Sequence, residues 1–271
     1  MNRRGFALLA GLWFLAAVGG IAAWGFTVAR LGVVTAGNRV LLFKAEWLRE
    51  ACVELARARY HEWAAGRRFS DGVGDIVTAL SLDSVPMGEM GWCTVATEDT
   101  GAKVDINLAD STILGCLLGS ERPLSKLLSA RPIPSVEAFL DILDVNSPTE
   151  RSLAGQLTVY GTAQVNFNAA PEAVLRCLPG LTPANAAIVV GLRRAGLRLT
   201  SLDAVLAALP VHSRDRVLRD YPAFIGVAVM APPRLLLRAT ASAWTGRVRS
   251  TTLVIAMPGG AELEIIRREA E

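Results

Sequence analysis

The chain opens Met1-Asn-Arg-Arg-Gly5-Phe-Ala-Leu-Leu-Ala10, and the 24 residues from Phe6 to Ala29 carry no charged side chain. The only polar side chain in that stretch is Thr27. As a helix it would be about 36 Å long, which is enough to cross a hydrocarbon core of about 30 Å. Two arginines precede it, and basic residues favour the cytoplasmic side of a span. The pattern predicts a single membrane span with a cytoplasmic N-terminus and everything after residue 30 outside.

Three interpretations of this segment remain open. A cleaved secretory signal has an apolar region of about 7–15 residues, which is shorter than this one. A plain single-span anchor needs only the apolar helix. The third interpretation rests on Gly5, because Arg3-Arg-Gly-Phe-Ala-Leu-Leu9 resembles the type III signal of prepilins and pseudopilins. That resemblance implies that a prepilin peptidase cleaves between Gly5 and Phe6 and that Phe6, the new first residue, is methylated.

The composition excludes several classes of protein. The 271 residues correspond to roughly two domains, and a hydrophobic fraction of 52% with a mean hydropathy of +0.37 excludes a disordered chain. Twenty-eight basic and 25 acidic residues give a net charge of +3, too small to indicate a polyanionic partner. Only two histidines occur, His61 and His212, so a catalytic His pair or a zinc site built from several His is not predicted. No nucleophile or phosphate-loop motif occurs, and we expect a protein that is not an enzyme.

The pattern after the span is amphipathic. Apolar residues recur at spacings of three and four from Val40 to Leu55, with charged residues between them. This periodicity predicts that the spanning helix continues outside the membrane to about Trp63 and ends before Gly66.

An internal repeat follows. Residues 104–119 can be laid over residues 165–180 with seven of sixteen positions identical, and Ser135–Leu143 similarly resembles Ser201–Leu209. Each copy predicts a short strand, a turn at an asparagine, a helix that ends at a glycine and a later helix with a serine N-cap. Those residues are Asn107, Gly119 and Ser135 in the first copy, and Asn168, Gly180 and Ser201 in the second. Two copies indicate an internal duplication and not a solenoid.

The second copy, from Leu178 to Val190, resembles a helix-hairpin-helix. In DNA-binding versions, backbone N–H groups of the hairpin hold a phosphate with help from a nearby basic residue. Here Thr182 stands where the second glycine is usual, and Arg193, Arg194 and Arg198 form either a basic patch or a solvated surface. The alternative function is therefore a membrane-anchored, helix-hairpin-helix DNA-binding protein of competence type.

The repeat also carries a more specific resemblance. Asp105-Ile-Asn107-Leu-Ala109 and Val165-Asn-Phe-Asn168-Ala-Ala-Pro171 resemble the two asparagine-containing units of K-type minor pseudopilins (general secretion pathway protein K) of type II secretion. Most pseudopilins carry Glu at the fifth position after the cleavage site, and K-type members lack it. Here that position is Ala10. The resemblance implies a subunit at the tip of the pseudopilus, anchored in the bacterial inner membrane with most of its chain in the periplasm. Its implied partners are the other minor pseudopilins, the major pseudopilin and the prepilin peptidase, and no nucleic acid.

The family fold implies an α+β architecture, in which an α/β body with an antiparallel sheet is interrupted by a mainly helical insertion that contains the repeat. The expected segments are a leader (1–5), the span (6–29), the rest of the spine helix (30–65), the first part of the body (66–106), the insertion (107–221) and the C-terminal strands of the body (222–271). The expected strands are Gly91 to Thr97, Lys103 to Ile106, Ala223 to Val229, Leu235 to Ala241, Arg247 to Met257 and Glu262 to Arg268.

The cysteines and the acidic residues suggest two further kinds of site. The four cysteines (Cys52, Cys93, Cys116 and Cys177) lack zinc spacing, and Cys116 and Cys177 occupy equivalent positions of the repeat. We expect these two to be small buried hydrophobes, with a disulfide between them as the alternative. Calcium sites are known in the K-type family, and the acidic candidates here are Glu98, Asp99 and Asp105, with a solvated turn as the alternative.

Overall fold

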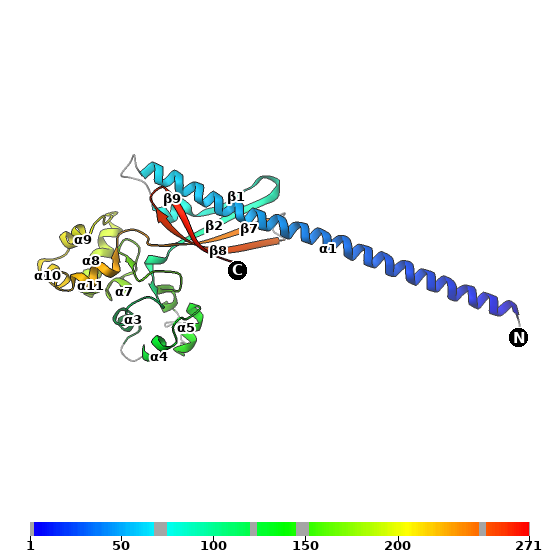
Figure 1. Ribbon diagram of the computed structural model, residues 1–271, viewed down its shortest axis with the longest axis horizontal. Helices are drawn as coiled ribbons and strands as arrows, with labels where there is room; N and C mark the ends of the chain where they lie inside the picture. Colours follow the sequence, from blue (N-terminus) through cyan, green and yellow to red (C-terminus); the bar gives the residue numbers. More distant parts are fainter. Residues whose placement is uncertain (1–2, 68–74, 120–123, 145–151, 244–247, 271) are drawn as a thin grey trace.

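The fold begins with a single long helix. The computed structural model describes residues 3–67, 75–119, 124–144, 152–243 and 248–270. Helix α1 (Arg3–Arg67) is 65 residues long, or about 98 Å. Its N-terminal half stands clear of the rest of the chain, and its C-terminal half lies along a sheet (Figure 1). The predicted continuous helix is confirmed, and it ends at Arg67 instead of before Gly66.

Five strands form one antiparallel sheet in the order β1-β2-β7-β8-β9. They are β1 (Leu82–Pro86), β2 (Gly91–Asp99), β7 (Leu235–Ala243), β8 (Val248–Gly259) and β9 (Glu262–Ala270). Side chains along β7 alternate between buried and partly exposed, as expected for a sheet that is covered mainly on one face. The predicted α+β class with an antiparallel sheet is confirmed.

The covered face of the sheet packs on the C-terminal half of α1. Buried residues of α1 recur at spacings of three and four, which places them on one side of the helix: Ala45, Leu48, Cys52, Val53, Ala56, Tyr60 and Ala64. From Leu48 onward they share a core with Val95, Leu237 and Val254 of the sheet. At the far end of this contact, the Tyr60 hydroxyl donates to the Gly260 carbonyl at 3.3 Å.

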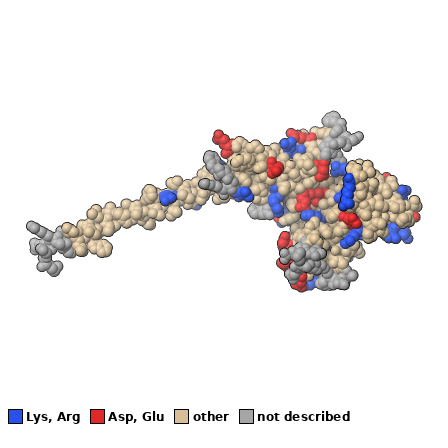
Figure 2. All heavy atoms as spheres, turned by 180° about the vertical axis from the view of Figure 1, so that it is seen from behind, with Lys and Arg blue, Asp and Glu red and all other residues tan. Residues whose placement is uncertain are grey.

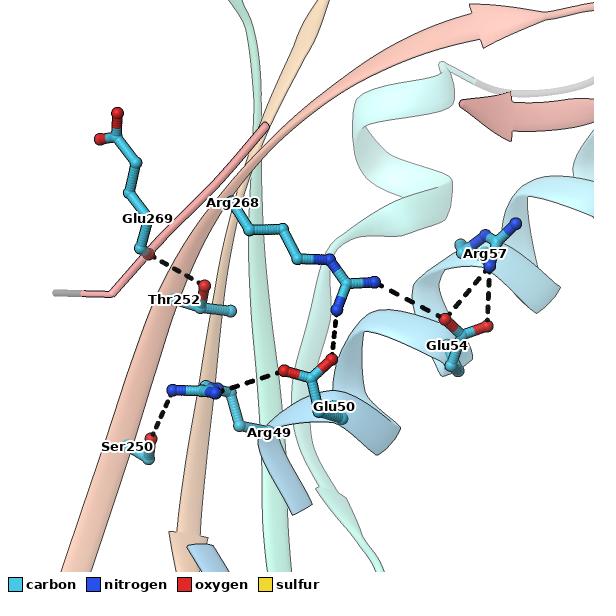
Figure 3. Close-up of polar contacts among 8 residues, drawn as sticks. All are labelled: Arg49, Glu50, Glu54, Arg57, Ser250, Thr252, Arg268 and Glu269. Carbon is cyan, nitrogen blue, oxygen red and sulfur yellow. Dashed lines mark hydrogen bonds and ion pairs between the residues drawn. The ribbon is translucent and has the colours of Figure 1, made fainter. Parts of the chain in front are cut away.

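Ion pairs add to this contact along strand β9 (Figure 3). Arg268 of β9 reaches both Glu50 and Glu54 of α1. Arg49 contacts Glu50 at 3.3 Å and donates to the Ser250 hydroxyl at 3.3 Å. Because these groups are partly exposed, each pair contributes at most about 1 kcal/mol. The apolar core therefore does most to hold α1 on the sheet.

A mainly helical segment is inserted between β2 and β7. Since Asp99 lies opposite Leu235 in the paired strands, the chain leaves and re-enters the sheet at one place. The segment contains α3 (Ser111–Leu118), α4 (Leu124–Ser129), α5 (Val136–Ile142), α7 (Glu172–Leu175), α8 (Pro183–Arg194), α9 (Leu202–Ala208), α10 (Val211–Arg219) and α11 (Tyr221–Val227). It has its own core, which includes Phe139, Phe167 and Phe224. In Figure 1, α8–α11 lie at the end of the molecule opposite the N-terminus of α1.

Short elements complete the chain. They are α2 (Ile76–Leu80), which packs on α1 and β2, and the 3-10 turns η1 (Gly88–Met90), η2 (Thr100–Ala102) and η3 (Ser152–Gln156).

The two copies of the repeat fold alike. In the first, β3 (Val104–Asp105) pairs in parallel with β4 (Leu157–Thr158), and in the second β5 (Val165–Asn166) pairs in parallel with β6 (Ala228–Val229). In each copy the first strand therefore pairs with a two-residue strand, β4 or β6, that is not part of the matched repeat sequence.

The predicted serine caps are present, and α3 ends at Gly119 as predicted, but α7 ends at Leu175, before Gly180. The hydroxyl of Ser135 accepts from the Ala138 N–H at 3.1 Å, and that of Ser201 accepts from the Ala204 N–H at 3.2 Å. Gly180 has a φ of +73°, and a Cβ there would lie 2.8 Å from the Cα of Val217. Glycine is therefore required at this turn both by its backbone conformation and by the close approach of α10.

One strand prediction is wrong, and a second strand is present but belongs to a different sheet. Residues 223–229 form most of α11 and then β6, because Pro222 stands in a first helical turn and Phe224 packs on Phe167 with ring centroids 5.4 Å apart. Residues 103–106 do not join the five-stranded sheet, since β3 pairs with β4 inside the insertion.

Candidate functional site: the exposed helix and the insertion junction

The N-terminal part of α1 is an exposed apolar surface. Apart from the half-buried Leu41, its large apolar side chains from Leu8 to Trp47 are 47–74% exposed, and Ala45 is the first residue of the helix to be buried against the body. The helix is long and apolar enough to cross a membrane. On the face shown in Figure 2, the rod formed by this part of α1 is almost free of charged atoms. The apolar surface extends beyond Ala29, since Val33, Val40 and Phe43 are also exposed.

Charge is distributed unevenly along this helix. The first 45 residues contain five basic residues and no acid, and Glu46 is the first carboxylate. Ala10 is exposed on the helix. The predicted processing residues Gly5 and Phe6 lie within α1, and their exposure is outside the described part of the structure.

A buried carboxylate joins the body to the insertion. Asp99, at the end of β2, is 5% exposed and accepts from Asn166 Nδ2 at 2.6 Å and from the Gly101 N–H at 2.8 Å. Burial raises the pKa of Asp99 to about 6, although these two hydrogen bonds act in the opposite direction. The Thr100 hydroxyl also donates to the Arg234 carbonyl across the same junction, at 3.0 Å.

The equivalent of Asn166 in the first copy is Asp105, which is 1% exposed. Its Oδ1 accepts from the N–H groups of Asn107 and Leu108 at 2.8 and 3.0 Å, and its Oδ2 accepts from the Gly161 N–H at 2.8 Å. Burial raises the pKa of Asp105 while these hydrogen bonds lower it. Arg234 donates to the Gly161 carbonyl at 2.7 Å, so the N–H and the carbonyl of Gly161 are both bonded to side chains, those of Asp105 and Arg234.

The three calcium candidates do not converge on one point. Asp99 and Asp105 accept from N–H donors, and Glu98 pairs with Lys103. Among the residues that the structure describes, no three His, Cys, Asp or Glu side chains are grouped so as to hold a metal ion.

The repeat asparagines lie in turns, as predicted, and their side chains bond to distant backbone groups. Asn107 both donates to and accepts from the backbone of Ile133, at 2.9 and 2.7 Å. Asn168 does the same with Leu199, at 2.7 and 2.9 Å, and also donates to the Met230 carbonyl at 2.7 Å. In each copy the asparagine therefore ties the strand–helix turn to the segment just before the serine-capped helix.

In both copies an arginine side chain also donates to carbonyls of the strand–helix turn, an arrangement called here the arginine clamp. Arg131 donates to the carbonyls of Ile106 and Ala109, at 2.8 and 2.9 Å. Arg193 donates to the equivalent carbonyls, those of Phe167 and Ala170, and to the Ala169 carbonyl at 3.2 Å. Burial of its guanidinium and the nearby charge of Arg194 lower the pKa of Arg193. Arg193 is therefore not a solvated member of a basic patch, whereas Arg194 and Arg198 are exposed.

All four cysteines are paired. Cys116 is bonded to Cys177, so of the two alternatives for this equivalent pair the disulfide is present, and Cys116 is not buried. Cys52 of α1 is bonded to Cys93 of β2, a pairing the sequence did not indicate. The first bond joins the two copies of the repeat, and the second joins the helix to the sheet.

The buried Asp99 makes stability depend on pH. Its folded pKa of about 6 exceeds the ordinary value of 3.8, so the folded chain binds this proton more tightly than the unfolded chain does. The free energy of unfolding should therefore fall as the pH rises from about 4 to 6, by an amount of the order of 1–3 kcal/mol. Urea unfolding of the detergent-solubilised chain measures this. In the Asp99→Asn variant the free energy of unfolding should fall less steeply between pH 4 and 6. Equal dependence on pH in the two proteins would contradict the raised pKa of Asp99.

The arginine clamp predicts a difference between neighbours. Replacing Arg193 by Gln removes hydrogen bonds to buried carbonyls and should lower the free energy of unfolding by about 1–3 kcal/mol. Replacing Arg194, which is exposed and beside it, should change that free energy by less than about 0.5 kcal/mol. Equal effects of the two substitutions in urea unfolding would show that Arg193 is not a clamp.

Comparison with known proteins shows the fold. No family model matches the sequence, and no curated protein matches it. A chain of the GspK-GspI-GspJ complex from the enterotoxigenic Escherichia coli type 2 secretion system superposes on this one with a TM-score of 0.58 and 11% identity. The match covers 88% of this chain and 99% of the other. The chain has a pseudopilin fold. The resemblance drawn from the leader and the repeat is thus confirmed at the level of the fold, including the long helix, the antiparallel sheet and the helical insertion.

Proposed function

We propose that the chain is a minor pseudopilin of a type II secretion system. In this role residues 6–29 hold the chain in the bacterial inner membrane. The chain then starts assembly with the other minor pseudopilins and caps the tip of a short periplasmic pseudopilus. The pseudopilus serves protein export across the outer membrane. The observation that carries the proposal is the exposed apolar part of α1 on a chain with a pseudopilin fold. An apolar surface of this length requires cover by a bilayer or by other helices.

The distribution of charge along α1 supports the proposed tip position. By resemblance, most pseudopilins offer a carboxylate near the start of the mature helix to the N-terminal amine of a neighbour. This chain has Ala10 at that position, and its first acid is Glu46. A subunit with no carboxylate in this part of the helix suits the one place in the fibre that has no subunit beyond it.

The segments then have separate roles. Residues 1–5 serve as the leader that the prepilin peptidase removes, α1 serves in the membrane and later in the fibre, and the body and insertion bind other pseudopilins. No step of this role needs a catalytic residue.

Co-purification tests the proposal. The full-length chain, produced together with the other minor pseudopilins of its own cell and extracted in mild detergent, should purify with them as one complex. The proposal is overturned if those pseudopilins purify with one another and leave this chain behind.

No observation favours the DNA-binding alternative. Arg193 donates to carbonyls of its own chain, and the Thr182 hydroxyl accepts from the Asn185 N–H at the hairpin where a phosphate would sit.

A further inference from the structure

Arg30 is the only charged residue between Gly5 and Asn38. It is exposed on α1 among side chains that are also uncovered, such as Phe26 (72% exposed) and Val33 (74%). The other polar group nearby, the Thr27 hydroxyl, donates to the Ala23 carbonyl at 2.8 Å. In the described part of the chain Arg30 has no ion-pair partner, and the nearest acid, Glu46, lies 16 residues or about 24 Å further along the helix.

The membrane alone does not explain this arginine. At the outer end of a span its long side chain can reach the headgroups. However, a basic residue on the exported side opposes the orientation that Arg3 and Arg4 favour. Once helices replace the lipid, the guanidinium brings five N–H donors and a full charge into an apolar contact. Such a charge is costly to bury unless a carboxylate pairs with it.

We propose that Arg30 pairs with a carboxylate on the apolar helix of a partner pseudopilin. This inference rests on the proposed function and names the chemistry of the contact. Before Glu46 the helix presents only positive charges, at Arg30, Arg39 and Lys44 once the leader is removed, so the complementary helix must supply the acid. The planar guanidinium is suited to hold a carboxylate through two parallel hydrogen bonds, which also fixes the stagger between the helices.

The test compares two arginines of one helix. Arg39 is also exposed and lies nine residues on, about half a turn around α1 from Arg30. Arg30→Gln should lower the amount of co-purified partner pseudopilin at least about tenfold, because it leaves the partner's carboxylate buried and unpaired. Arg39→Gln should leave that amount within about twofold of the unchanged chain. Arg30→Glu should lose the complex, and reversal of the partner's helix carboxylate to Arg should restore it.

Membrane insertion provides the second measurement. Resistance to carbonate extraction should be the same for the unchanged chain and for Arg30→Gln. If Arg30→Gln leaves the complex intact, or if it weakens insertion as much as assembly, the partner carboxylate is excluded, the second result pointing to a lipid phosphate. Failure of the unchanged chain to co-purify would instead overturn the proposed function, which separates the two failures.

Discussion

Removal of the Cys116–Cys177 disulfide is expected to destabilise the insertion by about 2–4 kcal/mol. The bond closes a loop with a sequence separation of 61 residues, and constraint of a loop of that length in the unfolded chain contributes about 4 kcal/mol at most. The insertion depends on it because its helices are short: α4, α5, α7, α9 and α11 have four to seven residues each. Helices of this length are not stable alone and require tertiary contacts.

The measurement is urea unfolding of the Cys116→Ala/Cys177→Ala double variant in detergent, followed by proteolysis at the insertion and in the body. The matched control is Cys52→Ala/Cys93→Ala, which removes a bond that closes a loop of similar size in the body. Because the two cores are distinct, each double variant should expose its own part to protease first. Free-thiol labelling of the denatured, unreduced chain should find no thiol, and a reactive thiol at Cys116 would contradict the pairing.

Local patterns predicted the local structure well. The apolar run and the three–four spacing that follows it predicted α1, and the β-branched tail predicted β7, β8 and β9. Within the repeat, each serine cap bonds to an N–H group three residues on, and Gly119 directly follows α3 as its C-cap, so the local sequence contains these interactions.

The features that the sequence did not predict depend on contacts between residues far apart in the chain. Residues 221–227 are rich in residues that favour strands, yet they form α11 because Phe224 is fully buried against Phe167, 57 residues earlier. Asp99 and Asn166 are 67 residues apart, and nothing in either segment indicates that they meet. The arginine clamps have the same character, since Arg193 reaches carbonyls 23 to 26 residues before it. The sequence does contain a signal for the arginine clamps. Arg131 and Arg193 are 62 positions apart, close to the offset of 61 between the two copies of the repeat.

Replacing Gly5 by Val is expected to leave the leader attached and to abolish assembly. In the prepilin signal that this segment resembles, the peptidase cuts after a glycine, and we expect a branched side chain at that position to block cleavage. The retained leader keeps Arg3 and Arg4 at the start of a helix whose first acid is Glu46, so in a fibre two further charges would enter an apolar contact without a partner from this chain. Such a cost outweighs the apolar packing of a few side chains.

Intact-mass analysis of the chain produced with the prepilin peptidase distinguishes the two forms. The unchanged chain should lack Met1 to Gly5 and carry one methyl group on Phe6, whereas Gly5→Val should keep all five residues. The control is Gly11→Ala, since a Cβ at Gly11 would meet no atom of a described neighbouring side chain within 4 Å, and this variant should be processed and should assemble normally. A Gly5→Val chain that is cleaved at the same bond would contradict the type III signal. One that stays uncleaved and still joins the complex would show that α1 tolerates the leader charges in the fibre, and the need for paired charge along this helix would then be wrong as well.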